Sequence, residues 1–174
     1  MISRITPVTP GTRPELAQQE AQILAERGRI SPLYQILLNS PPIAHGWEQM
    51  LSAVRNRSSL SADLRELVIL RVAILNRAPY EFDAHLPIAQ SAGLSDAAIE
   101  AVKQLDTPDG SAWSAQQQLA IRMTDAMTLN LEVSDQLYEE VRQHFDAQGQ
   151  IDLVATIAAY NMVSRFLIAL KIGH

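Results

Sequence analysis

The sequence predicts an all-α fold, a single-domain bundle of about seven or eight helices, from three observations. Glycine and proline divide the chain into segments of helical rather than strand length. No run of strand length alternates between apolar and polar residues. Apolar residues recur instead at helical spacing, as in Trp47, Met50, Leu51 and Val54. With 174 residues, 47% of them hydrophobic, one domain with one core is expected.

The chain is expected to begin with an extended arm at residues 1–14, followed by a domain over residues 15–174. Three of the nine prolines lie in this arm, where they disfavour helix. Gly28 suits the left-handed position after a first helix, and Pro41 and Pro42 break the chain after a second. The first three helices are therefore predicted at residues 15–27, 31–38 and 43–55.

The helix predicted at residues 62–76 is apolar on nearly every side, so it should lie at the centre of the fold. Ser61 is its expected N-cap, and Asp63 lies in the first turn, where the helix dipole favours a negative charge. The next helix is predicted at residues 79–92. Pro87 is expected to kink it, because proline cannot donate the helical hydrogen bond.

The rest of the chain is also predicted to be helical. Ser95 caps a short helix that reaches about residue 105, and a turn follows at residues 107–110. Three further helices are predicted at residues 112–130, 134–148 and 151–170. Gly149 is expected to close the second of these. The last has little polar surface, which predicts burial in the monomer or in a subunit interface.

Composition and charge exclude several classes of function. The formal net charge of −5, without any run of Lys or Arg, disfavours nucleic-acid binding. Prolines and charges near the start leave no apolar signal segment, so a cytoplasmic location is expected. Asn161 and Arg165 interrupt the longest apolar stretch, which argues against a membrane span. The absence of cysteine excludes disulfides, Cys-ligated zinc, iron–sulfur clusters and thiol nucleophiles.

A carboxylate on the apolar central helix requires an explanation. Glu66 projects to the same side as Ile69 and Leu70. Since burying an unpaired carboxylate is costly, Glu66 must be paired, hydrogen-bonded, protonated or directed into a cavity. Arg71, on the same helix, raises the same question. A purely structural pair between Glu66 and Arg71, or an interface salt bridge, is one interpretation, and a functional site is the other.

Glu81 and His85 lie four residues apart, so they share a helical face and can act on one bound molecule. A neighbouring carboxylate raises the pKa of histidine, whereas a dry pocket lowers it. An ordinary exposed pair is the structural alternative. The other histidines, His45, His144 and His174, form no ligand spacing, so neither a metal nor another cofactor is expected.

Residues on the two central helices form a recognisable pattern: Arg65-Glu66, Leu70-Arg71-Val72-Ala73, Asn76, Tyr80-Glu81-Phe82, His85, Ala89 and Gly93-Leu94. A second block follows at residues 159–167. This pattern resembles the carboxymuconolactone decarboxylase and alkylhydroperoxidase D superfamily. The resemblance covers most of the chain from about residue 32. It implies an alkylhydroperoxidase D-like all-α fold and self-association as homotrimers, or as hexamers built from them.

The resemblance also separates two branches of that superfamily. As the resemblance implies, the hydroperoxidase branch uses a Cys-x-x-Cys pair that lies in a proton relay between a glutamate and a histidine. Glu66 and His85 match the relay, but the cysteine positions fall on Ala78 and Glu81. Because a thiolate must attack the peroxide, thiol peroxidase chemistry is not open to this chain, even if its family name suggests an antioxidant role. The pattern fits the decarboxylase-like branch better.

The resulting hypothesis is a carboxy-lyase that decarboxylates a small lactone or keto acid without a cofactor. The carbanion can delocalise into an adjacent carbonyl, so a proton donor and carboxylate-binding groups suffice. His85 is the expected proton donor or enolate partner, oriented by Glu66 and assisted by Glu81. The alternative is a non-catalytic, small-molecule-binding or structural oligomer. The expected substrate-binding residues are Arg71 and Arg77, whose guanidinium groups match a carboxylate, and Tyr80.

Overall fold

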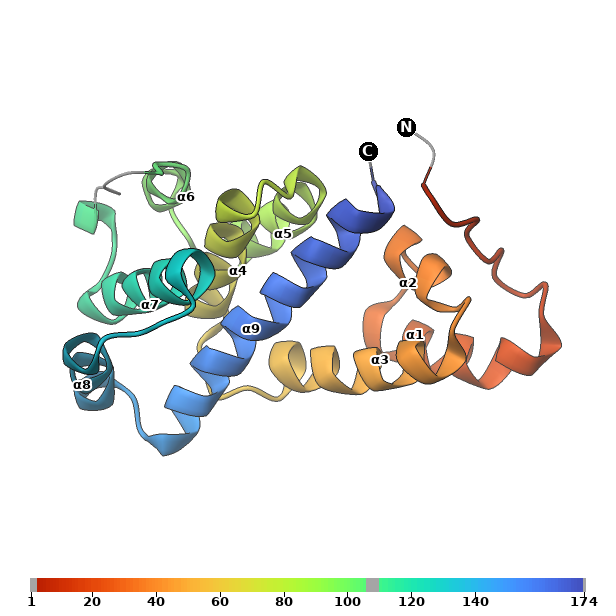
Figure 1. The fold of residues 1–174 in the computed structure, drawn as a ribbon, viewed down its shortest axis with the longest axis horizontal. Coiled ribbons are helices and arrows are strands. Elements are labelled where there is room, and N and C mark those ends of the chain that lie inside the picture. Colours follow the sequence, from red (N-terminus) through yellow and green to blue (C-terminus); the bar gives the residue numbers. More distant parts are fainter. Residues whose placement is uncertain (1–2, 106–109, 174) are drawn as a thin grey trace. The chain divides into compact units, whose positions relative to one another are not determined.

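The computed structural model describes residues 3–105 and 110–173. Within these residues the chain forms nine α-helices and no strand (Figure 1). The all-α prediction is therefore confirmed. The helix count exceeds the expected seven or eight, and each of the nine helices lies in a segment for which helix was predicted, including the short α2 (Pro32–Leu37) and α6 (Asp96–Val102). The turn predicted at residues 107–110 lies mostly outside the described residues.

The chain divides into two compact units, residues 1–57 with 166–174 and residues 58–165. The first unit contains α1 (Ala17–Arg27), α2 and α3 (Pro41–Asn56). The second contains α4 (Ala62–Leu75), α5 (Pro79–Ser91), α6, α7 (Ala115–Asp125) and α8 (Asp135–His144). The last helix, α9 (Ala147–Leu170), begins in the second unit and ends in the first.

Backbone hydrogen bonds hold the N-terminal segment of the first unit. The amide of Arg4 donates to the carbonyl of Leu170 at 2.9 Å, and that of Val8 donates to Gln35 at 2.9 Å. The side chain of Val8 is buried. The segment ends in a 3₁₀ turn, Pro14–Leu16, which begins with a proline because the first helical position needs no amide donor. These bonds fix the segment against its own unit.

Local chemistry explains several helix boundaries. Gly28 has a φ of 71° and closes α1 in the left-handed conformation, as predicted. The Ser95 hydroxyl accepts the amide of Ala98 at 3.1 Å and caps α6. Ser61 does occupy the N-cap position of α4, but its side chain makes no capping bond. α5 continues as one helix through Pro87.

Two predicted boundaries in the C-terminal third were wrong. α8 ends at His144 rather than at Gly149, because the Asp146 carboxylate accepts the amide of Gly149 at 2.8 Å in the first turn of α9. The single helix predicted at residues 112–130 starts later and changes geometry. Ser114 and Gln117 form a capping box that starts α7, and a π-helix, Ala126–Asn130, follows it.

The core of the second unit is centred on α4, which packs against α5, α6 and α7 (Figure 1). This position confirms the prediction drawn from the apolar sequence of α4. Because α4 is surrounded, even its charged residues Glu66 and Arg71 are buried. The core cluster includes Leu67, Leu70, Ala73, Phe82, Ala89, Leu94, Ala98, Ile99, Trp113 and Ile121.

α9 is long and apolar enough to cross a membrane by length and composition alone. Half of that stretch is buried inside the protein, a property that the core helices of soluble proteins share. Within the second unit, Asn161 on α9 accepts a hydrogen bond from Asn76 and donates one to Thr128, each at 2.9 Å. Such buried polar pairing is what a core helix requires.

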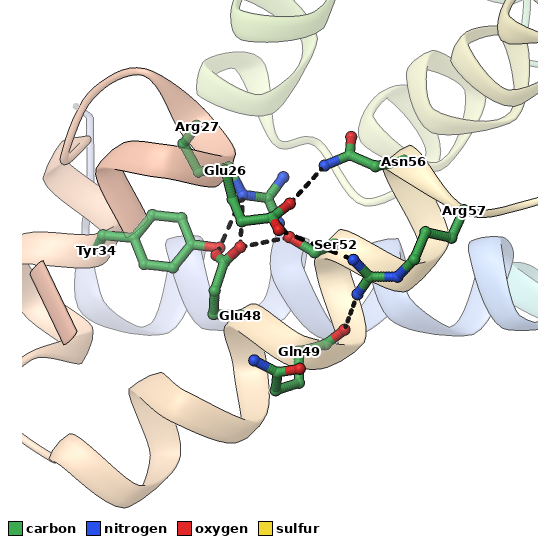
Figure 2. Close-up of polar contacts among 8 residues, drawn as sticks. All are labelled: Glu26, Arg27, Tyr34, Glu48, Gln49, Ser52, Asn56 and Arg57. Carbon is green, nitrogen blue, oxygen red and sulfur yellow. Dashed lines mark hydrogen bonds and ion pairs between the residues drawn. The ribbon is translucent and has the colours of Figure 1, made fainter. Parts of the chain in front are cut away.

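A buried polar cluster fastens the three helices of the first unit around Glu48 (Figure 2). Arg27 Nε lies 3.1 Å from Glu48 Oε2, and the hydroxyls of Tyr34 and Ser52 both donate to the same carboxylate. Burial, together with the hydrogen bond to Glu48, raises the pKa of Tyr34 above its usual value. The cluster compensates a carboxylate that would otherwise be unfavourable in the core.

The Tyr34→Phe substitution tests the contribution of this cluster to stability. It is expected to lower the free energy of unfolding by about 1–2 kcal/mol, because a buried carboxylate loses one donor. Urea unfolding followed by circular dichroism measures the change. Tyr138→Phe is the matched control, since the Tyr138 hydroxyl donates to Gln150 at the exposed surface. Equal losses in the two variants would contradict the role of the cluster.

Candidate functional site

The candidate site lies between α4 and α5 in the second unit. A tight corner after α4 reverses the chain, so that the two helices pack against each other. As a result, Glu66 on α4 faces His85 on α5, with 2.6 Å between Glu66 Oε2 and His85 Nδ1. On the other side of the ring, His85 Nε2 lies 3.4 Å from Glu81 Oε1. The structure thus brings together the three residues expected to be catalytic.

Burial rules out the ordinary surface pair that the spacing of Glu81 and His85 allowed. Glu66 is 1% exposed, and Glu81 and His85 are each 5% exposed. The ring of Tyr160 stands edge-on to the imidazole, with 5.1 Å between ring centroids and an interplanar angle of 90°. These contacts restrict the orientation of the imidazole between its two carboxylates.

The charges of the site are partly balanced. Arg65 Nε lies 3.6 Å from Glu66 Oε1, close enough for electrostatic attraction but too far for a good hydrogen bond. The two carboxylates therefore face one guanidinium and one imidazole. Within the described part of the chain, no group of three or more histidine and carboxylate side chains is placed to hold a metal ion.

The carboxylates control the protonation of His85. Burial by itself lowers the pKa of this histidine, but the hydrogen bonds and negative charges of Glu66 and Glu81 outweigh burial and raise the pKa above 6.5. Because His85 gains these partners only on folding, its imidazolium stabilises the folded state. This stabilisation is fully present below the unfolded pKa and is lost as pH rises through the folded pKa.

A titration of the His85 ring by NMR tests this electrostatic picture. The imidazole signals are expected to titrate above pH 6.5 in the folded protein. In the Glu66→Gln variant the titration should move to lower pH, because the ring loses a negatively charged acceptor. The exposed His144 provides an internal reference in the same spectra. A His85 titration at or below pH 6.5 in the parent protein would contradict the picture.

Arg71 does not pair with Glu66, contrary to the structural interpretation of the sequence. Its Nε and Nη2 lie 2.6 and 2.8 Å from the carboxylate oxygens of Asp125, and Nη1 donates to the carbonyls of Val102 and Gln104. The side chain is fully buried. Because these partners occupy the guanidinium, Arg71 ties α4 to α7 and to the end of α6 and is not free to hold a substrate carboxylate.

An apolar cavity of about 510 Å³ lies beside the site. This volume suits a small organic molecule. Its buried lining residues are Ala73, Ala78 and Phe82, whereas Arg77, Asp83 and Lys103 are exposed at its rim. Ile74 and Pro79 complete the described lining.

The cavity and the buried residues share one turn of α5. Ala78 and Phe82 line the cavity, and Glu81 belongs to the same turn. Neither Glu81 nor His85 is part of the described lining, and the half-buried Tyr80 is not part of it either. Of the three expected substrate-binding residues, Arg77 is therefore the one that the structure places at the cavity.

The chain is similar to known proteins in sequence and in fold. Residues 41–121 match the carboxymuconolactone decarboxylase family, and this segment includes Glu66, Glu81 and His85. The matched segment is just under half of the chain and contains the two central helices that carry the sequence resemblance. The superfamily resemblance drawn from the sequence is thus confirmed, and the absence of cysteine in this chain agrees with it.

Three proteins illustrate these similarities in sequence and in fold. The uncharacterized protein YdfG of Bacillus subtilis (strain 168) is 29% identical over 116 residues, which are 66% of this chain and 78% of YdfG. The peroxidase-related AhpD core protein of Ralstonia eutropha JMP134 has a TM-score of 0.79 at 17% identity, with 99% of this chain and 92% of that chain covered. The debrominase Bmp8, solved as a cysteine-to-alanine variant with 2,3,4-tribromopyrrole, has a TM-score of 0.79 at 14% identity, with coverage of 99% and 91%.

Several residues at or near the candidate site were missed by sequence reasoning. Tyr160, which packs on His85, does lie in the C-terminal block that carries the family resemblance, so a signal existed. Asp125, the partner of Arg71, lies 54 positions further along the chain and has no local signal. Lys103 and Asp83 gain significance only from the cavity that they share with Arg77.

Proposed function

We propose that this protein is a cofactor-free carboxy-lyase that acts on a small carboxylated lactone or keto acid. The observation that carries the proposal is the buried row of Glu66, His85 and Glu81 beside an apolar cavity with a cationic rim. Clusters of titratable groups with a perturbed pKa next to a cavity are typical of active sites. The family, which is named for a decarboxylase, supports the same class of reaction.

The reaction requires little from the protein. The substrate loses its carboxylate as carbon dioxide, and the electron pair of the broken C–C bond passes into the adjacent carbonyl as an enolate. The enolate carbon then takes up one proton, so that a carboxylate and a proton become carbon dioxide and a C–H bond. An apolar cavity favours the first step, because the localised charge of a carboxylate is less well solvated there than the delocalised charge of the transition state.

The buried residues supply the proton. We assign proton donation to His85, because the hydrogen bonds and negative charges of Glu66 and Glu81 raise its pKa and so favour the protonated ring. Glu66 holds Nδ1 and orients the ring. Glu81 carries the proton from Nε2 toward the cavity, since it shares a helical turn with Ala78 and Phe82. Arg77 holds a carboxylate of the substrate at the rim, where its guanidinium offers paired donors.

Release of carbon dioxide from candidate acids tests the proposed function. The purified protein is incubated with a panel of β-keto acids and carboxylated lactones, and carbon dioxide is measured by a coupled assay. Turnover of at least one compound, lost in His85→Ala but not in His144→Ala, is the expected result. A panel without turnover above the uncatalysed rate would reject the carboxy-lyase.

A second candidate function is small-molecule binding without catalysis on the same scaffold. One observation favours it: the described lining of the cavity contains neither Glu81 nor His85. In that case ligands bind, but no acid in the panel releases carbon dioxide. Thiol peroxidase or thiol-dependent dehalogenase chemistry is excluded for this chain, because it has no cysteine to act as the nucleophile.

We further propose that the protein is cytoplasmic and self-associates as a homotrimer or as a hexamer built from trimers. Large apolar side chains on the second unit support self-association, since Leu131 is 80% exposed and Ile151 is 69% exposed. Light scattering after size exclusion at micromolar concentration is expected to give three or six chain masses. A monomer under these conditions would contradict this part of the proposal.

A further inference from the structure

The charges around the cavity carry more information than the proposed reaction uses. Arg77, Lys103 and Asp83 all line its rim, while the remaining described lining, Ala73, Ile74, Ala78, Pro79 and Phe82, is apolar. The rim therefore has two positive charges and one negative charge. A ligand with an apolar body and a single anionic group matches both the rim and the interior.

We propose that the cavity selects molecules with one carboxylate and an otherwise apolar body. Arg77 and Lys103 hold the carboxylate at the rim, and Asp83 disfavours a second carboxylate. This inference goes beyond the proposed reaction, because it concerns which ligands the cavity binds, and it agrees with the second candidate function, small-molecule binding without catalysis. Lys103 and Asp83 become specificity-determining residues that the sequence did not indicate.

Arg77 is held in position by its backbone. Its φ of 54° lies in the left-handed region, which a non-glycine residue adopts only when its surroundings impose it. The preceding Asn76 donates to Asn161 at 2.9 Å, and Arg165 in turn donates to Asn161 at 2.8 Å. In the described part of the chain, the Arg77 guanidinium has no ion-pair partner. An exposed guanidinium that has no ion-pair partner among the described residues can bind an incoming carboxylate.

Lys103 can exchange its present partner for a ligand carboxylate with little loss of protein stability. Its ammonium lies 2.5 Å from Glu100 in an exposed pair, and exposed pairs contribute little to stability. The same ammonium lies 5.6 Å from the centroid of the Phe82 ring, whose side chain forms part of the buried lining. Lys103 is thus close to the apolar surface on which the body of a ligand would pack.

Asp83 provides the discrimination. Among the residues that the structure describes, its carboxylate forms no ion pair, so its charge is not neutralised by a partner. A second carboxylate in the cavity would be repelled by Asp83 and would lose water without gaining a further cationic partner. The specificity for a single carboxylate would therefore come both from attraction by Arg77 and Lys103 and from repulsion by Asp83.

Calorimetric titration with unreactive acids tests this inference separately from catalysis. Affinity is expected to increase from hexanoate to heptanoate to octanoate by about fourfold per methylene, which corresponds to burial of apolar surface. Suberate, with a second carboxylate, and neutral 1-octanol are each expected to bind at least about tenfold more weakly than octanoate. Equal affinity for octanoate and suberate, or no dependence on chain length, would overturn the proposal. Because none of these compounds is turned over, a failed carboxy-lyase assay leaves this result unaffected.

Variants identify the residues responsible. Lys103→Met and Arg77→Asn are each expected to weaken octanoate binding by about tenfold. Asparagine is chosen at position 77 because it tolerates a positive φ. Lys103→Arg should retain binding. Asp83→Asn should reduce the difference in binding affinity between octanoate and suberate. Arg142→Gln is the matched control, since Arg142 also forms an exposed pair three residues away on a helix, with Glu139.

The scarcity of lysine permits an independent measurement. Lys103 and Lys171 are the two lysines of the chain. Acetylation followed by mass spectrometry is expected to be slower at Lys103 when octanoate is bound and unchanged at Lys171. Equal protection of both lysines, or of neither, would overturn the assignment of Lys103 even if a variant at that position failed to fold.

Discussion

The His85→Ala variant is expected to lose about 10²–10⁴-fold in kcat on any acid that the parent protein decarboxylates. His85 is held between two carboxylates at 2.6 and 3.4 Å, which raise its pKa and so favour the protonated ring as the proton donor. Steady-state release of carbon dioxide measures the loss. Removal of the ring also leaves Glu66 and Glu81 as buried carboxylates without their shared partner, so folding must be checked in the same samples.

Two further variants separate catalysis from structural damage. His144→Ala, which removes an exposed histidine, should retain full activity. Glu66→Gln keeps the size of the side chain but removes its charge, so Glu66 acts as a positioning residue and the pH profile is the informative readout. In the pH–rate profile, the pKa of the group that donates the proton should move to lower pH, because the pKa of His85 falls when Glu66 loses its charge. Full activity in a folded His85→Ala protein would reject the assignment.

The position of the site could be predicted from the sequence because its signals are local. α4 is apolar on nearly all sides, so Glu66 is conspicuous there. The four-residue spacing of Glu81 and His85 places them on one face of α5. The corner between α4 and α5 is short, so two consecutive helices pack against each other and bring Glu66 to His85. Each step depends on helix geometry, which sequence patterns report well.

The partners of buried charges could not be predicted, because they depend on tertiary packing. Arg71 finds Asp125 on α7, and Glu48 in the first unit finds Arg27 and Tyr34. Nothing in the spacing of these residues distinguishes them from exposed polar side chains. The same reason explains why Lys103 was missed, since it joins Arg77 only through the shared cavity.

The boundaries of α7, α8 and α9 were wrong for a different reason. Glycine was expected to end a helix at Gly149, but the side chain of Asp146 accepts the Gly149 amide and starts α9 instead. Similarly, Ser114 and Gln117 start α7 by mutual capping, so that the helix begins at Ala115, three residues after its predicted start. Capping side chains, rather than glycine alone, determine where these helices begin and end.

The Asp125→Ala variant is expected to lower the free energy of unfolding by about 3–5 kcal/mol, because it leaves Arg71 as a buried cation without its carboxylate. Arg71 is fully buried, and Asp125 accepts hydrogen bonds from both its Nε and Nη2. Glu140→Ala is the matched control: it removes the carboxylate partner of Arg122, an exposed arginine on the same helix, and should cost only a small fraction of that loss.

Urea unfolding of both variants measures the difference, and a double variant sharpens the interpretation. Arg71→Met combined with Asp125→Ala removes the buried cation together with its partner, so it should be more stable than Asp125→Ala alone, although the carbonyls of Val102 and Gln104 lose a donor. If instead Asp125→Ala and Glu140→Ala lowered the free energy of unfolding by equal amounts, burial of the Arg71 guanidinium would not depend on its ion pair with Asp125. The ion pair between Arg71 and Asp125 would then not be what holds α4 to α7.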